Sequence, residues 1–451
     1  MNTRASVGVV GPYWDFWEDA VEVDIRSAKK TLHERCTAEI AALSEVVWNV
    51  SDADLDDGLA DVDVIVVVVQ MAAPPQIVQE FLKNRPGTVK LIWAAHDTPR
   101  VEEPFTHESI VIRGATVGAS MLAASLFNEG ISYDLALGEP GSASVAQALK
   151  SALAAGSVRG ARLSVIGGAL AGYDFVTSPE SELSRLGIEL VRHSPGEFAQ
   201  RAQEVRPAAL SEYLRSVDQS WHESTTPDGS EKAVRYALAL EELVNADGSV
   251  AGTLNCHVAE LRKDPLGPGV APCFGLGRET SAGRPWTCTG DINTSLAMLF
   301  VAALGHPTFY HEMEAVDVTT GEVILANSGE HDTRFVNPES LRFTSNPWYP
   351  GPHPTPIVRF QIEPGPATIV AMSAASGRFR AIVAEGEFTS RSAEPTGTMS
   401  AVFRFSHLVG SKGWEKWAQA GSSHHSCATN AHIAQDIERL CKHLDIEFIQ
   451  I

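Results

Sequence analysis

The chain has 451 residues, of which 44% are hydrophobic and 20% charged, and its formal net charge is −21. This length predicts several domains of roughly 150 residues, with cores large enough to need no disulfides. The negative charge argues against nucleic acids and anionic membranes as partners, because both would repel the chain. A bilayer-spanning helix needs ~18 apolar residues, whereas Val64–Val69 has only the length of one buried strand.

The first residues, MNTRASVGVVG, have no apolar region of the kind that secretory signals carry, and they lead directly into a strand. We therefore expect a cytoplasmic protein. The cysteines form no CxxC pair, and their spacing fits no zinc ribbon or finger, so we expect reduced thiols. They are Cys36, Cys256, Cys273, Cys288, Cys427 and Cys441.

Strands and helices alternate through the first third of the chain. The segment from Val62 to Gln70 is almost entirely valine and isoleucine, which is typical of a parallel strand covered by helices on both faces. This pattern predicts a doubly wound α/β domain over residues 1–155. Its expected elements are strands at Ser6–Val10, Val62–Gln70 and Val89–Ala95 and helices at Val21–Leu43 and Ser142–Ala155.

A second α/β layer begins near residue 156, and we expect a second doubly wound parallel-sheet domain over residues 156–305. Its strands are expected at Ala161–Ile166 and Ile188–Arg192, and its helices at Ala233–Val244 and Thr294–Leu304. The glycine-rich segment Gly167–Gly172 follows a strand and could cradle a phosphate. A tight strand-to-helix turn is favoured, because the spacing is not GxGxxG and no acidic residue ends the following strand.

Beyond residue 306 the pattern changes to short β-branched segments separated by proline and glycine. This texture predicts an antiparallel β-barrel-like domain over residues 306–451. Its expected elements are a strand pair within Glu314–Asn327, strands at Thr355–Ile362, Ala367–Ser373, Arg378–Ala384 and Met399–Phe405, a helix at Ala431–Leu444 and a strand at Ile446–Ile451.

Three segments concentrate side chains that bind metals. The first contains Glu312 and Glu314, and the second contains Glu330, His331 and Asp332. Such a run of carboxylates and imidazole is a dense set of potential ligands. The third segment, Gly421–Cys427, contains adjacent histidines among small residues. Adjacent side chains leave a strand on opposite faces, so we expect one histidine to bind and the other to support it.

Two further segments have a structural and a functional interpretation. Asp291 or Asn293 is well placed to cap the helix that follows, by accepting a hydrogen bond from a free backbone N–H. Trp14 follows the first strand, and ligands of open α/β sheets bind at the carboxyl ends of strands. Its ring could stack on a sugar, or it could form a subunit contact.

Taken in chain order, these features resemble the L-arabinose isomerase and L-fucose isomerase superfamily. The resemblance is most specific at Cys288–Met298, Phe309–Asp332 and Gly421–Cys427, and the ending Leu444–Ile449 is also similar. It implies three domains, a divalent metal that is usually Mn²⁺, and homo-trimers or homo-hexamers. It also implies a small-molecule sugar substrate that is interconverted between aldose and ketose through an ene-diol. The metal then polarises the carbonyl, and a carboxylate moves the proton.

Residues carried over from the superfamily form a candidate site. The implied metal ligands are Glu312, His331 and His425, although His331 lies about two residues later than a gap-free alignment places the family histidine, near Ser328. The implied catalytic groups are Glu312, Asp291 and Glu330. The implied substrate contacts are Trp14 and His424, and His424 is also the alternative to His425 as a ligand.

One position departs from the superfamily pattern. The family has a glutamate, both ligand and acid/base, where this chain has Thr289. Glu330, Asp291 or Asp332 could supply the missing carboxylate. We therefore expect a metal-dependent aldose–ketose isomerase. The alternatives are a diverged metal-dependent epimerase or lyase on a sugar derivative, and a non-catalytic sugar-binding protein of the same fold.

Overall fold

The computed structural model describes residues 5–51, 55, 58–101, 103–217, 219–262, 269–336, 338–346, 353–391 and 397–451. The chain divides into two compact units. The N-terminal unit comprises Asn2–Arg159 and Gln435–Ile446, and the large unit comprises Gly160–Ala434 and Glu447–Ile451. The sequence suggested boundaries near residues 155 and 305. The structure places a unit boundary at residues 159 and 160, and it groups the other two predicted regions in the large unit.

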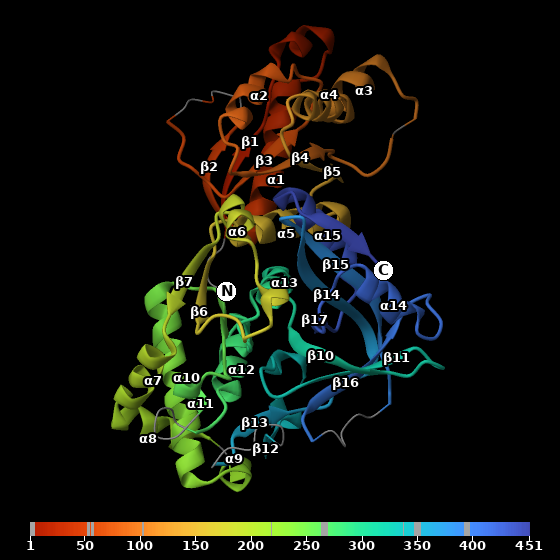
Figure 1. The fold of residues 1–451 in the computed structure, drawn as a ribbon. Helices are drawn as coiled ribbons and strands as arrows, with labels where there is room; N and C mark the ends of the chain where they lie inside the picture. The colour runs from red at the N-terminus through yellow and green to blue at the C-terminus, as the bar shows by residue number, and fades with distance from the viewer. Residues whose placement is uncertain are drawn as a thin grey trace. The chain divides into compact units, whose positions relative to one another are not determined.

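The N-terminal unit is a doubly wound parallel sheet with the strand order β2-β1-β3-β4-β5 (Figure 1). Its strands are β1 (Ser6–Val10), β2 (Glu45–Val50), β3 (Val64–Val69), β4 (Val89–Ala95) and β5 (Asp134–Gly138). Its helices are η1 (Asp15–Ala20), α1 (Ile25–Leu43), α2 (Gln76–Lys83), α3 (His107–Ile112), α4 (Ala115–Asn128), α5 (Ala143–Val158) and most of α15 (Ala434–Leu444).

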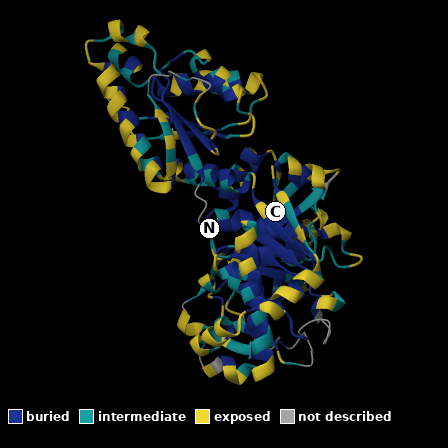
Figure 2. Cartoon of the chain, turned by 90° about the vertical axis from the view of Figure 1, so that its left-hand side faces the viewer, coloured by how far each residue is buried: buried dark blue, intermediate teal, exposed yellow. Residues whose placement is uncertain are grey.

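The apolar run that predicted a central strand forms β3, and all six of its residues are buried. Side chains alternate along a strand, and Ile65, Val67 and Val69 pack against α2 and α4 in one apolar cluster. The opposite face meets α5, where Gly156 lies against Val64. Figure 2 shows the result, with dark blue strands between helices whose outer residues are exposed.

The large unit contains a four-stranded parallel sheet with the order β7-β6-β8-β9. Its strands are β6 (Arg162–Ile166), β7 (Glu189–His193), β8 (Ala251–Leu254) and β9 (Trp286–Thr287). The associated helices are η2 (Asp174–Val176), α6 (Glu180–Arg185), α7 (Pro195–Glu204), α8 (Pro207–Ser216), α9 (Gln219–Ser224), α10 (Pro227–Asp247), α11 (Ala259–Arg262), α12 (Cys273–Ser281) and α13 (Ile292–Ala303).

The C-terminal part of the large unit is a seven-stranded mixed sheet with the order β14-β17-β10-β11-β16-β15-β18 and an additional β14–β15 pairing. Its elements are β10 (Phe309–Val316), β11 (Glu322–Asn327), β14 (Gly365–Ala375), β15 (Arg378–Phe388), β16 (Met399–Phe405), α14 (Lys412–Gln419), β17 (His425–Thr429) and β18 (Glu447–Gln450). We expected an antiparallel domain. The sheet is mixed, because β18 follows α15 and pairs with β15 in parallel.

Helix α13 joins the two sheets of the large unit, since it packs against β8 and β9 on one side and against β14 and β17 on the other (Figure 1). Its residues from Ile292 to Ala302 are all buried. A two-stranded hairpin accompanies the larger sheet, and it is formed by β12 (Arg342–Ser345) and β13 (Pro356–Arg359), with η3 (Thr333–Phe335) and η4 (Pro338–Ser340) before it. The start of α13 therefore lies where both sheets can contribute side chains.

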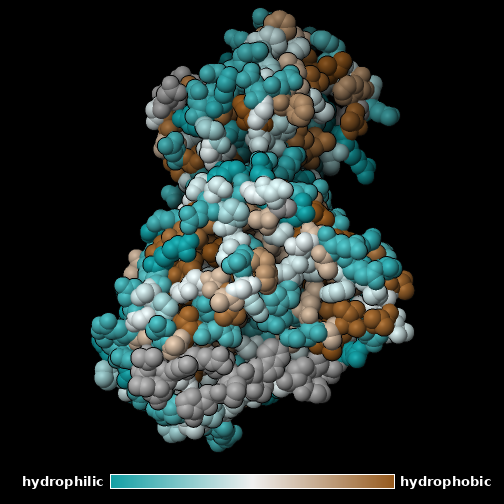
Figure 3. All heavy atoms as spheres, viewed as in Figure 1, coloured by the Kyte–Doolittle hydropathy of each residue, from teal (hydrophilic) through white to brown (hydrophobic). Residues whose placement is uncertain are grey.

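Apolar side chains are exposed on the N-terminal unit around α3 and α4, where Figure 3 shows brown atoms at the surface. Phe127 is 75% exposed, and Ile110 and Val117 are more than half exposed. Clusters of this kind occur at binding surfaces. Among the described residues, no helix is long and apolar enough to cross a membrane. All six cysteines are buried free thiols.

Candidate metal centre

Strand pairing brings Glu312 and His425 together. Strands β10 and β17 are antiparallel, and Glu312 lies directly opposite His425. Opposed residues of an antiparallel pair project from the same face. The His425 Nε2 atom lies 3.3 Å from Glu312 Oε1. Two segments more than a hundred residues apart therefore converge on one side of the sheet.

Asp291 completes the arrangement from the start of α13. It is the N-cap predicted from the sequence, since its Oδ1 accepts the backbone N–H of Thr294 at 2.7 Å. Its Oδ2 lies 2.8 Å from His425 Nδ1. In the protonated ring Nδ1–H donates to Asp291 and Nε2–H donates to Glu312, so Nε2 is the nitrogen that would bind a metal beside Glu312 after losing its proton. A carboxylate in this position fixes the tautomer and orientation of a metal-binding imidazole.

The electrostatics of this pair favour positive charge at His425. Burial disfavours the imidazolium, but the hydrogen bonds to Asp291 and Glu312 raise the pKa of His425 to about 9. Burial likewise opposes ionisation of Glu312, but its bond with His425 lowers the pKa of this carboxyl group. The site therefore stabilises a cation between two carboxylates.

His424 joins the same group. Its ring centroid is 3.9 Å from that of His425, and Tyr173 and Phe175 of the η2 segment lie beside it. One ligand atom from each of Glu312, His424 and His425 falls within 4.8 Å of the others. The expectation that adjacent histidines face opposite ways does not apply, because β17 begins at His425 and His424 precedes it.

These donors fit a divalent metal. Two imidazoles and one carboxylate suit manganese, iron, cobalt and zinc, and the Asp291 carboxylate supplies the support that a ligating histidine usually has. Glu312 is about one-third exposed through its side chain, so the group is not sealed from solutes.

A strained loop positions Asp291. Thr289 has φ +58°, in the left-handed region that a β-branched residue rarely adopts. The next residue, Gly290, has φ +77°, and a Cβ added there would lie 2.0 Å from the Gly168 carbonyl oxygen. The backbone N–H of Leu170 donates to the Thr289 carbonyl at 2.8 Å. Gly290 therefore allows this loop to lie directly against the turn that the glycine-rich segment forms.

Residues 346–447 match the family model of the L-arabinose isomerase C-terminal domain. This match supports membership of the arabinose/fucose isomerase superfamily, and it rests on residues 346–447 alone. The match suggests a sugar isomerase family. It covers β17 with His424 and His425, whereas Asp291 and Glu312 precede it. No curated protein matches the chain.

The superfamily resemblance also implied His331 as a ligand, and the structure does not bring it to the metal-binding group. His331 forms an isolated bridge with Phe309. Phe309 and Glu312 are three residues apart on β10, so they project from opposite faces. The His331 ring lies against Phe309 and Phe360, and burial lowers its pKa to about 3. It is a neutral histidine on the core side of the sheet.

Three carboxylates were the alternative candidates for the one that Thr289 replaces, and the structure gives them different surroundings. Asp332 is buried and bonded to Arg334 at 2.8 and 2.5 Å, and Asp291 holds His425. Glu330 is also buried, but its Oε1 has no hydrogen-bond partner among the described residues. Burial, followed by the nearby Cys256, raises the pKa of Glu330 to about 7.

Other side chains near the group were not singled out from the sequence. His257 acts on Glu312 through its charge, and hydrogen bonds with Cys288 and His257 lower the pKa of the buried Cys256 thiol. Cys256 and His257 lie two and three residues after the end of β8, so the carboxyl end of a parallel strand was the signal that could have identified them. Tyr310 lies 5.1 Å from His425, ring to ring.

Trp14 belongs to the N-terminal unit. Its ring stacks on Phe16 at 4.5 Å and meets the edge of Trp17, and its backbone N–H contacts the Met71 sulfur at 3.2 Å. These contacts are structural, and the expected sugar contact stays a prediction.

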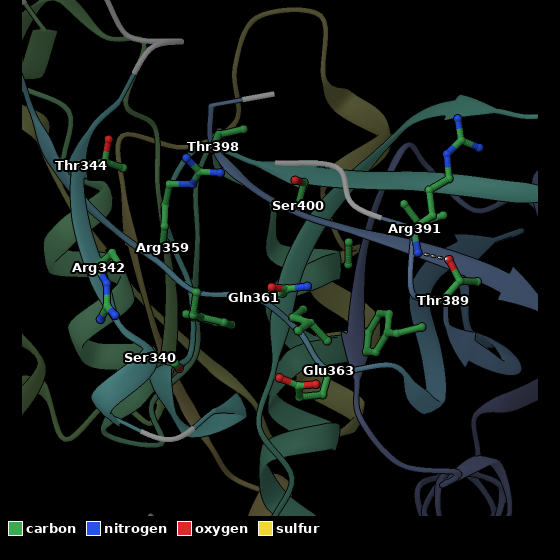
Figure 4. Close-up of a pocket in the computed structure, with 15 residues that line it drawn as sticks. Ser340, Arg342, Thr344, Arg359, Gln361, Glu363, Thr389, Arg391, Thr398 and Ser400 are labelled. Atoms are coloured by element: carbon green, nitrogen blue, oxygen red, sulfur yellow. Dashed lines mark hydrogen bonds between the residues drawn. The ribbon is translucent and has the colours of Figure 1, made fainter. Parts of the chain in front are cut away.

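The large unit also has a polar cavity of about 370 Å³ beside the β12–β13 hairpin. Figure 4 shows Arg359, Gln361 and Glu363 on the segment that ends β13 and follows it, near Thr398 and Ser400. None of the metal-binding group lines this cavity. It is therefore a separate feature.

Proposed function

We propose that the protein is a metal-dependent sugar isomerase that interconverts an aldose and a ketose through an ene-diol. The observation that carries this proposal is the convergence of Glu312, His424 and His425, with Asp291 bonded to His425. The superfamily match supports the same class of reaction.

Glu312, His424 and His425 would hold the metal, which the resemblance suggests is Mn²⁺. A divalent cation bound there would supply Lewis-acid polarisation of a sugar carbonyl. Asp291 keeps the His425 Nε2 atom directed toward Glu312, so that the two donors are preorganised. Preorganisation reduces the reorganisation that the site must undergo when its ligands bind.

Glu330 is our candidate for the group that moves the proton. Side chains alternate along an extended chain, so the pairing of His331 with Phe309 puts Glu330 on the face of Tyr310 and Glu312. A carboxyl group with a pKa of about 7 both accepts and donates a proton near neutral pH. It would take a proton from the carbon beside the carbonyl and return it to the adjacent carbon. Thr289 cannot do this, because its hydroxyl does not ionise at neutral pH.

Two measurements test this proposal. Elemental analysis should find about one divalent metal per chain after Mn²⁺ is supplied, and the Glu312→Ala, His425→Ala double variant should lose it. A panel of aldoses in ²H₂O should then show deuterium incorporation at the carbon next to the carbonyl. Glu330→Gln should abolish this exchange and retain the metal, whereas Glu314→Gln on the same strand as Glu312 should retain both. No metal in the natural protein would exclude the mechanism.

Thr289 supports one second candidate, a metal-dependent epimerase or lyase on a sugar derivative. Both reactions begin with proton abstraction next to a carbonyl, so they can proceed with one family carboxylate missing. The product distinguishes them, because isomerisation moves the carbonyl, epimerisation inverts one carbon and elimination releases water. Binding of a sugar without any exchange would instead indicate a non-catalytic protein.

A further inference from the structure

A small cavity of about 180 Å³ lies in the N-terminal unit, apart from the residues used above. In the strand order β2-β1-β3-β4-β5 the winding direction changes beside β1. Ligands of doubly wound sheets bind in the crevice outside the carboxyl ends of the strands at such a point. The cavity occupies this position, since its lining includes Gly11 after β1 and Gln70 after β3.

Apart from Tyr13, the ionisable residues that line the cavity are basic. They are Arg26, Lys29, Lys30 and His33 of α1, and their spacing of three, four and seven residues puts them on one face of the helix. Among the residues that the structure describes, no aspartate or glutamate lines the cavity, although Glu18 pairs with Arg26 at 2.8 Å and the chain has a net charge of −21. This local reversal of charge would attract an anion and orient it against α1.

Lys29 is 7% exposed, and its ammonium group donates to two backbone carbonyls, those of Gln70 at 2.7 Å and of Ile112. Burial lowers its pKa to about 8, so it remains mostly charged at pH 7. The negative charge of Asp97 raises the pKa of Lys29, but Asp97 also lies 3.6 Å from Arg113, whose charge lowers it. A buried ammonium with neutral partners is stabilised by an anion that reaches it.

Lys90 shows that this bonding alone does not identify a ligand site. It is equally buried at 3% exposure, its ammonium donates to the carbonyls of Arg85 and Thr88, and burial lowers its pKa to about 8. Lys90 does not line this cavity. The distinguishing features of Lys29 are therefore the cavity and its basic neighbours.

Gln70 provides an independent observation. Its side chain is 95% buried at the cavity wall, and its Oε1 atom has no hydrogen-bond partner among the residues described. A buried amide oxygen without a donor is costly. A hydroxyl group on a bound molecule would satisfy it, while the basic face of α1 neutralises a charged group on the same molecule.

We propose that this cavity binds a phosphate group, with Lys29 and Lys30 contacting the phosphate oxygens. In this proposal Gln70 Oε1 accepts a hydrogen bond from a hydroxyl group of the same molecule. The phosphate comes either from inorganic phosphate or from a small hydroxylated phosphate ester. Sites for larger ligands usually exceed about 300 Å³, so the cavity excludes a whole nucleotide. The proposal is independent of the isomerase reaction, because no residue of the metal-binding group takes part.

Isothermal titration of the full-length protein tests the proposal, in EDTA and at constant ionic strength set with chloride. Inorganic phosphate and a pentose 5-phosphate are the two probes, and the unphosphorylated pentose is the control. We expect saturable binding of at least one phosphate probe and none of the neutral pentose. Lys29→Met and Lys30→Gln should each raise the Kd of the phosphate probe about tenfold or more. Lys90→Met, the matched buried lysine, should bind as the natural protein does.

Gln70→Leu identifies the source of the phosphate. If the ester is the ligand, this variant loses affinity for the pentose phosphate and keeps its affinity for inorganic phosphate. If Lys29→Met fails to fold, as circular dichroism would show, the exposed Lys30→Gln variant still decides the result. Equal binding by Lys30→Gln and the natural protein would overturn the proposal. So would the absence of binding by both phosphate probes, or an equal loss of affinity in Lys90→Met.

Discussion

His425 directs its two ring nitrogens to two carboxylates that have different roles. Glu312 belongs to the metal-binding group, whereas Asp291 contacts His425 Nδ1 and the start of α13. We expect Asp291→Asn to weaken Mn²⁺ binding roughly 10–100-fold, because the amide no longer supports the imidazole with a negative charge. Competition with a fluorescent chelator measures this affinity.

Folding of the same variant is checked separately by circular dichroism. Asparagine is as good an N-cap as aspartate, but the melting temperature of the metal-free Asp291→Asn protein should fall, because the buried His425 loses its charged partner. Glu314→Gln alters a carboxylate on the same strand, outside the metal-binding group, and should leave the affinity unchanged. Unaltered Mn²⁺ affinity in Asp291→Asn would contradict the positioning role.

Glu330 makes a pH-dependent contribution to stability. Its pKa in the folded protein is about 7, above the ordinary 4.5, so between these values the folded state holds a proton that the unfolded state has lost. Stability is therefore lost as the pH rises from 4.5 to 7. Relative to the natural protein, Glu330→Gln should gain roughly 2–3 kcal/mol of unfolding free energy between pH 5 and pH 8.

Urea unfolding of metal-free protein at the two pH values measures this gain. Glu387→Gln on β15 is the control, because its side chain is 55% exposed, and it should show no such pH dependence. If the difference in unfolding free energy between Glu330→Gln and the natural protein is the same at both pH values, the Glu330 pKa is not raised in the folded state.

At the residue scale, the sequence predicted those contacts that depend on local rules. The Asp291 cap follows from its place before an apolar helix, and the metal-binding clusters follow from their composition. The position of the His331 side chain could not be predicted in this way. It depends on which residue after Gly329 pairs with Phe309 of β10. A shift of one residue in strand pairing moves a side chain to the opposite face, and no local pattern sets that register.

At the element scale, the loop before α13 depends on the glycine-rich turn after β6. Gly290→Ala would put a Cβ 2.0 Å from the Gly168 carbonyl oxygen at φ +77°. We expect the free energy of unfolding of this variant to fall by roughly 3 kcal/mol or more. The causes are the strain of a left-handed backbone at alanine and the forced displacement of the neighbouring backbone. It should also lose Mn²⁺ affinity, since Asp291 follows directly.

Gly196→Ala is the matched control. Gly196 lies in α7 with nothing within 4 Å of an added Cβ, so this change should be neutral or stabilise by about 0.5 kcal/mol. Thermal unfolding and chelator competition compare the two variants. Equal thermal stability and equal Mn²⁺ affinity of the two variants would show that the loop before α13 does not closely contact the glycine-rich turn after β6.

Elements with strong periodicity were predictable, and those without it were not. The apolar run at β3 and the β-branched segment Met399–Phe405 form the expected strands. Strand β17 begins with the metal-binding residue His425, directly after His424. It was not expected, because His425–Thr429 contains serine, cysteine and alanine without alternation. Its pairing partners β10 and β14 stabilise it, which is information outside the segment.

At the scale of the whole molecule, the N-terminal unit is completed by a distant helix. Asp134 of β5 is buried and contacts Arg439 and Lys442 of α15 at 2.5 and 3.1 Å. The α15 residues Leu440 and Leu444 are fully buried. The sequence predicted this helix and could not assign it to a unit, because amphipathicity shows which face is buried and not what covers it.

We expect residues 2–159 alone to be largely unfolded. Removal of α15 leaves Asp134 without its partners and exposes apolar side chains that contribute about 2 kcal/mol each, against a net stability of roughly 5–15 kcal/mol. A synthetic peptide of residues 434–446 should restore near-ultraviolet circular dichroism. The same peptide with Leu440→Asp and Leu444→Asp should not. A fragment that folds without any peptide would contradict this expectation.

The place of α15 has a consequence for biosynthesis. The chain that forms the N-terminal unit leaves the ribosome first, but the helix that completes it is translated after residues 160–434. At roughly 5–20 residues per second this interval lasts roughly 15–50 s. During that time Asp134 lacks its cationic partners, and an apolar face stays open to chaperones. The N-terminal unit therefore stays incomplete throughout this interval, although its first strands are the first part of the fold to be translated.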